Sequence, residues 1–187
     1  MKLKIAFPLA FLVAGAALTG CSNKNMTPKQ AGEVEILEYC SGSEYKSDKN
    51  HFRATSSAVS MNRETAKKVA RSNAENKLAR SIMITIESVT DNYVDQSTYN
   101  NKEEVTTTFK DLARSTVDQV LSGAITSCER LTQKANGDYV SYIAVELSAT
   151  ELVGKYNERL SQDERIRAEY NYEQFKETFE AEMAKQR

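Results

Sequence analysis

The chain has 187 residues with 25 basic and 26 acidic side chains, a length that fits one domain. A formal net charge of −1 is not basic enough to suggest a nucleic-acid-binding protein. No GxGxxG or GxxxxGK[ST] loop occurs, which excludes the nucleotide-binding folds that depend on these phosphate loops.

Met1–Cys21 has the layout of a bacterial secretory signal. A basic start is followed by the almost wholly apolar Ile5–Leu18, and Leu18-Thr19-Gly20-Cys21 resembles a lipobox, the signal for a lipidated cysteine. The apolar run is shorter than the roughly 20 residues that cross a bilayer as a helix. We therefore expect residues 1–20 to be cleaved and Cys21 to carry lipid; an uncleaved anchor and a plain secreted protein are the alternatives.

The expected lipid would hold the mature chain on a membrane, because two or more acyl chains anchor durably where one does not. Ser22 stands where an aspartate would usually retain a lipoprotein at the inner membrane, which favours the outer membrane. Residues 21–32 are polar after the cysteine and are typical of a flexible tether. The tether has no acidic run, which favours a domain that faces the periplasm.

An α+β domain is expected over residues 33–153. Glu33–Cys40 and His51–Ser60 alternate as strands do, and Glu103–Ser122 has a helical pattern. The clearest helix is Met61–Asp91, in which apolar residues recur every three or four positions. This stripe consists of Ala66, Ala70, Ala74, Leu78, Ile82, Ile86 and Val89.

A hairpin is predicted near the end of this domain. Two alternating segments, Ala124–Lys134 and Asp138–Ser148, flank Asn136-Gly137, which is the strongest short-range hairpin signal. A loop of two or four residues would place Cys128 opposite Val145. Both side chains would then lie on the core face of the sheet.

Residues 154–187 are predicted to be a charged helical extension, as one long helix or a helix pair. Its second apolar stripe contains Tyr170, Phe175, Phe179 and Met183. Two alternatives stay open for this stripe: it packs on its own domain, or it contacts another subunit or envelope protein. We take the partner contact as the working hypothesis.

The candidates for chemistry are few. His51 is the only histidine, and no cysteine pair has metal-ligand spacing, so we predict no metal, no cofactor and no catalytic residue. Cys40 and Cys128 could form a disulfide in an oxidising compartment. The alternative is two buried thiols that never meet.

Several segments together resemble the LPP-twenty lipoprotein family. They are the lipobox, the strand HFRATSSAVSMN, the helix ETAKKVARSNAENKLARSI and the hairpin DYVSYIAVEL, and the resemblance covers about residues 52–152. It implies an α+β fold, a small antiparallel sheet with helices on one face, here followed by a long charged C-terminal helix. Relatives include flagellum-associated outer-membrane proteins that build rings or discs. The resemblance implies no set of catalytic residues.

We therefore expect a non-enzymatic lipoprotein of the outer membrane that serves as an assembly or interaction module. Its partners would be the membrane, through its lipid, and a second copy or another envelope protein, but no nucleic acid. The alternative is a periplasmic binding protein for a small molecule or cell-wall fragment. In that case Thr55–Ser60, Tyr139 and Tyr142 would form the site.

Overall fold

The computed structural model describes residues 36–185; the signal, the lipidated Cys21 and the tether predicted for residues 1–32 lie outside the described residues. Residues from Glu38 onward form one compact unit. Its elements are β1 (His51–Ser60), α1 (Arg63–Gln96), α2 (Lys102–Val120), β2 (Ile125–Gln133), β3 (Tyr139–Ser148), α3 (Ala149–Gln162) and α4 (Tyr172–Ala184). The strands form an antiparallel sheet in the order β1-β3-β2 with four helices packed against it, which confirms the α+β class.

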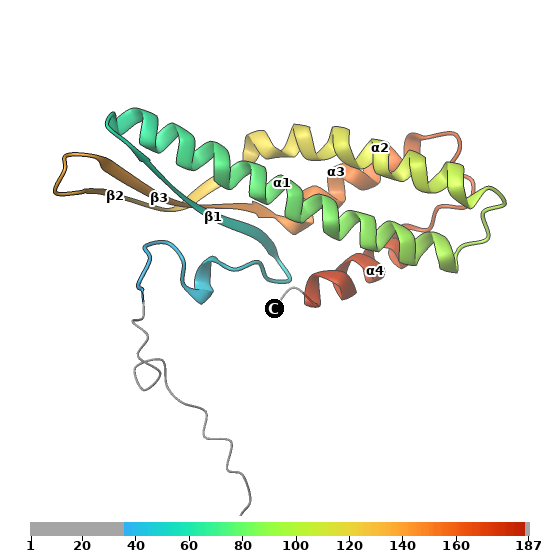
Figure 1. The fold of residues 1–187 in the computed structure, drawn as a ribbon. Helices are drawn as coiled ribbons and strands as arrows, with labels where there is room; N and C mark the ends of the chain where they lie inside the picture. Colours follow the sequence, from blue (N-terminus) through green and yellow to red (C-terminus); the bar gives the residue numbers. More distant parts are fainter. Residues whose placement is uncertain (1–35, 186–187) are drawn as a thin grey trace, which may run out of the picture. The chain divides into compact units, whose positions relative to one another are not determined.

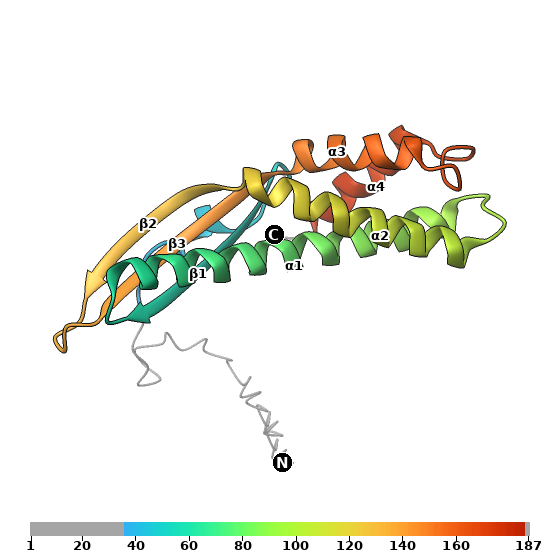
Figure 2. The same ribbon diagram turned by 90° about the horizontal axis from the view of Figure 1, so that it is seen from above.

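Helix α1 connects the two halves of this unit. Its first half lies along β1 and β3, and its second half packs against α2 and α4 (Figures 1 and 2). All seven residues of the predicted stripe are fully buried, so the sequence pattern identified the inward face. The helix begins at Arg63, two residues after the predicted start at Met61, because the Asn62 side chain caps it by accepting a hydrogen bond from the Thr65 N–H at 3.0 Å.

The β2–β3 hairpin differs from its predicted register by one residue. Cys128 pairs with Ala144 and not with Val145. A backbone hydrogen bond of 2.8 Å across the turn leaves only Ala135–Gly137 in the loop, and Gly137 has a φ of 91°. Because this loop has an odd length, Cys128 moves to the opposite face of the sheet, away from α1. The predicted core position of Cys128 is therefore wrong.

The segment before β1 is not a strand. Residues 36–50 contain only a short 3-10 turn, Ser43–Tyr45, so the prediction for Glu33–Cys40 is wrong over its described part. Cys40 has a φ of 57°, a left-handed conformation that interrupts an extended strand. The Ser41 hydroxyl donates to the Glu38 carbonyl at 2.6 Å and helps to hold this bend.

This segment covers the sheet face that α1 leaves open. Cys40 forms a disulfide with Cys128, and the two Cα atoms are 5.7 Å apart. The possible disulfide is therefore present, and the alternative of two separate thiols is wrong. Beside it, the ring of Tyr39 meets that of Tyr142 edge-on at 5.4 Å between centroids. Helices therefore cover one face of the sheet, and a disulfide-linked loop covers part of the other.

The C-terminal part is a helix pair that belongs to the domain, and not a long helix extending from it. Helix α3 packs on α2 and α4 packs on α1 (Figure 2). The boundary predicted between residues 153 and 154 falls inside α3. Phe175, Phe179 and Met183 are 0%, 3% and 0% exposed, and Tyr170 is half-buried against the same core. The stripe thus packs on its own domain, which is the first of the two alternatives. A partner could reach these side chains only if α4 left the domain.

An aromatic cluster explains why α4 packs inward. Phe175 lies with its ring centroid 5.6 Å from those of Tyr93 and Tyr156, and 6.2 Å from that of Phe109. The Tyr156 hydroxyl donates to the Phe109 carbonyl at 2.7 Å, so the buried polar group is satisfied. Burial raises the pKa of this hydroxyl and keeps it neutral.

Candidate functional site

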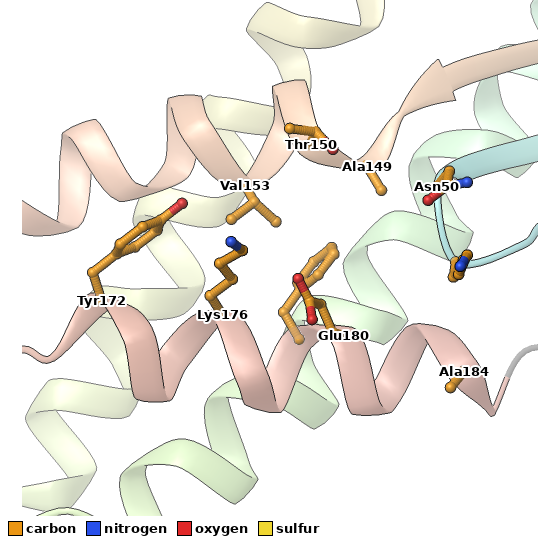
Figure 3. A pocket seen from close by; sticks show the side chains of 10 residues that line it. Asn50, Ala149, Thr150, Val153, Tyr172, Lys176, Glu180 and Ala184 are labelled. Carbon is orange, nitrogen blue, oxygen red and sulfur yellow. The ribbon is translucent and has the colours of Figure 1, made fainter.

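A groove lies between α3 and α4 (Figure 3). Its volume is about 470 Å³, within the range of small-molecule sites. The first turn of α3 forms one wall, α4 forms the other, and the turn at Lys49–Asn50 lies at one end. The groove is therefore built from three segments that are distant in sequence.

Hydrogen bonds to backbone groups fix the positions of the two helices that form the walls of the groove. The Ala149 N–H donates to the Asn50 carbonyl at 2.8 Å, which joins the turn to the start of α3. The Ser148 hydroxyl caps α3 by accepting from the Glu151 N–H at 3.3 Å. Asn171 caps α4 in the same way, accepting from the Gln174 N–H at 3.1 Å. Both helices therefore start at defined positions beside the groove.

A buried carboxylate locks the far end of α4 onto α1. Glu182 is 9% exposed and accepts hydrogen bonds from Ser88 and Asn92 of α1, each at 2.9 Å. Its hydrogen bond with Lys185 is the main cause that lowers its pKa, with Ser88 and Asn92 adding to the effect. This contact fixes the rotation of α4 and so decides which of its residues face the groove.

The face of α4 that flanks the aromatic stripe supplies two of the three charges of the groove. Tyr172, Lys176 and Glu180 follow one another at intervals of four residues and point toward α3 in Figure 3. Within residues 36–185, the side chains of Lys49, Lys176 and Glu180 form no ion pair or hydrogen bond. The groove thus offers two ammonium groups and one carboxylate that are available to a ligand.

Apolar side chains lie beneath these charges. Val153 of α3 and Phe179 of α4 are 6% and 3% exposed and form part of the lining. A ligand in the groove would therefore meet an apolar surface as well as charged groups. This combination is typical of binding sites, in which apolar contact supplies area and a few polar groups set orientation.

The binding site predicted on the strands lies elsewhere and is partly occupied. Tyr142 packs against Tyr39, and the Ser57 hydroxyl donates to the Glu38 carboxylate at 3.1 Å. Tyr139 is half-buried near the hairpin turn. The N-terminal loop therefore engages residues that we expected to contact a ligand.

A charged network closes the same sheet face. Arg53 donates to Asp48 at 2.6 Å and to Glu146 at 2.8 Å. The hydrogen bond from Arg53 is the main cause that holds the pKa of Asp48 at about 2. His51 lies beside this network, with its Nδ1 3.7 Å from an Asp48 oxygen. The network links the loop to β1 and β3, and we assign it a structural role.

Metal-binding clusters and membrane-spanning helices are both absent from residues 36–185. No group of three histidine, cysteine, aspartate or glutamate side chains there is arranged to hold a metal ion. In the same range, no helix has the length and apolar character needed to cross a membrane.

Comparison of the chain with protein-family models, with curated proteins and with solved structures found no match. The resemblance to the LPP-twenty family therefore stays a prediction from the quoted segments. The groove was not predicted from the sequence either. The available signal was the i, i+4 spacing of Lys176 and Glu180 on the face that flanks the aromatic stripe, but charges on a helix are usually only solvated.

Proposed function

We propose that the chain is a non-enzymatic lipoprotein, held on the outer membrane by lipid on Cys21, whose domain acts as an interaction module facing the periplasm. The Cys40–Cys128 disulfide is the observation that carries this proposal, because structural disulfides persist in oxidising compartments outside the cytoplasm. The lipobox-like end of Met1–Cys21 and the resemblance to the LPP-twenty family support the lipid anchor.

Metabolic labelling with palmitate tests the anchor. The full chain should incorporate label and sediment with outer-membrane vesicles. Cys21→Ser should lose the label, whereas Ser22→Ala should keep it. An unlabelled wild-type chain, or a Cys21→Ser chain that is still labelled, would refute the anchor.

The assembly role is tested by the solution molar mass of the Cys21→Ser chain, measured by light scattering over a concentration series. A defined oligomer would support an assembly module. Because Phe175 and Phe179 are buried, such an oligomer would use another surface of the domain. A monomer at every concentration would contradict self-assembly.

The groove favours a second candidate function, a periplasmic binding protein for a small molecule or cell-wall fragment. Its volume of about 470 Å³ and the unpaired charges of Lys49, Lys176 and Glu180 support this role. Binding and membrane anchoring are compatible in one protein, so each is tested separately.

A further inference from the structure

The charges of the groove between α3 and α4 define the chemistry of a ligand. We infer that this groove binds a short acidic peptide that carries a free amino group. The inference rests on the binding role proposed above for the groove and names the class of ligand.

The two ammonium groups come from different elements. Lys49 belongs to the turn that contains Asn50, whereas Lys176 lies on α4, one helical turn after Tyr172. Figure 3 shows Asn50 and Tyr172 toward opposite ends of the groove. Two carboxylates on one peptide, such as a C-terminus and an acidic side chain, match two separate cations better than one compact anion does.

Glu180 adds a requirement for positive charge on the ligand. Its carboxylate points into the groove and lies four residues after Lys176, yet the two side chains form no ion pair in the structure. A ligand with only negative groups, such as an inorganic phosphate, would be repelled by this carboxylate. An amino group facing Glu180 would satisfy it, and the two lysines would still favour a net negative ligand.

The uncharged lining suits the rest of a peptide. Val153 and Phe179 offer an apolar surface to a side chain. Asn50 and Thr150 at the same end of the groove can donate to and accept from a peptide backbone. Free peptides and the stem peptides of the bacterial cell wall both carry carboxylates and amino groups, so both sources share the chemistry that the groove recognises.

Isothermal titration of the Cys21→Ser chain with the tripeptide Ala-Phe-Glu tests this inference. This probe has an amino group for Glu180, an aromatic side chain for the apolar floor and two carboxylates for Lys49 and Lys176. Its acetylated and amidated analogue with glutamine in place of glutamate has none of these charges. We expect the charged tripeptide to bind at least tenfold more tightly than the analogue.

Matched variants connect binding to the groove. Lys176→Met should weaken binding of Ala-Phe-Glu at least tenfold. Lys155→Met is the control, because Lys155 lies on α3 outside the lining and pairs with Glu158 at 3.3 Å. Glu180→Gln should remove the preference for a free over an acetylated amino group, and Glu177→Gln on the same helix should preserve it. Lys176, Glu177 and Glu180 are exposed and the Lys155 side chain is 44% exposed, so the thermal unfolding of each variant should match that of the wild type.

Purified cell-wall sacculi form the second arm of the experiment. Co-sedimentation that Ala-Phe-Glu competes away identifies stem peptides as a ligand, and tripeptide binding without co-sedimentation identifies free peptides; both outcomes support the inference. No binding of Ala-Phe-Glu at millimolar concentration, or equal losses in Lys176→Met and Lys155→Met, would overturn it. Binding of the uncharged analogue alone would refute the ligand class but leave the binding role, and palmitate labelling decides the anchor independently.

Discussion

Phe175→Ala is the sharpest test of the C-terminal helix pair, because it separates a core residue from an interface residue. Phe175 is fully buried, and its ring has four aromatic neighbours with centroids between 5.6 and 6.2 Å away. Truncating a buried phenylalanine costs about 3–5 kcal/mol of unfolding free energy, part of it from lost ring–ring contacts of about 0.5–1.5 kcal/mol per pair. We expect a loss of about 4 kcal/mol.

Urea unfolding of the Cys21→Ser chain, followed by circular dichroism, measures this loss. With a slope of about 2 kcal/mol per molar urea, the midpoint should fall by about 2 M. Phe175→Leu keeps most of the apolar volume and should cost only about 1–1.5 kcal/mol, so the series stays informative if the alanine variant does not fold. A midpoint lowered by less than about 0.5 M, together with a changed molar mass, would show that Phe175 serves an interface and that our packing argument is wrong.

Three further predictions concern stability. Loss of the disulfide, in Cys128→Ser or with reductant, should lower the unfolding free energy by up to about 4.5 kcal/mol, because the bridge closes a loop with a sequence separation of 88 residues. Urea unfolding with and without reductant measures this loss. The pKa of Asp48 is lowered from 3.8 to about 2 on folding, so its contribution is complete above about pH 4 and is lost as the pH falls toward 2. Because this carboxylate is 42% exposed, Asp48→Asn should cost less than about 1 kcal/mol at pH 7, and this cost should shrink as the pH falls through 2. Glu182→Ala leaves two α1 donors without their acceptor and should cost about 1–3 kcal/mol, with faster amide hydrogen exchange in α4, whereas Glu182→Gln should cost less.

Helix α1 was predictable because its apolar residues recur every three or four positions from Ala66 to Val89, over roughly six turns, and a strand would need alternation instead. Its alanines at positions 66, 70 and 74 and its larger aliphatic residues after them repeat at helical spacing, and every one is buried. Likewise, the bounds of β1 match the predicted segment His51–Ser60. Local periodicity determines such elements, and tertiary packing does not override it here.

The register of the β2–β3 hairpin could not be predicted from its local sequence. Asn136-Gly137 predicted a turn correctly, but the same dipeptide fits loops of different length. The φ of 91° at Gly137 belongs to a loop with an odd number of residues, and this alone reversed the face on which Cys128 lies. Consequently the disulfide to Cys40 covers the second face of the sheet and does not enter the α1 core.

The aromatic stripe of α4 was ambiguous for a different reason. Its spacing predicts which face of the helix is apolar, but a sequence does not say whether its own domain or a partner covers that face. The deciding groups are distant: Tyr93 on α1, Phe109 on α2 and Tyr156 on α3 surround Phe175. The groove was equally hidden, because its lining combines a turn before β1 with two helices near the C-terminus.

Phe179 belongs both to the hydrophobic core and to the lining of the groove. Its ring meets that of Phe52 on β1 with centroids 6.2 Å apart, and the same side chain lines the groove. The turn that carries Lys49 leads directly into β1, so one aromatic contact sets the distance between this turn and α4. The two lysines of the groove are therefore placed by packing between the sheet and the last helix. If α4 served only as an external contact, its packing against the sheet would not fix the positions of Lys49 and Lys176 relative to each other.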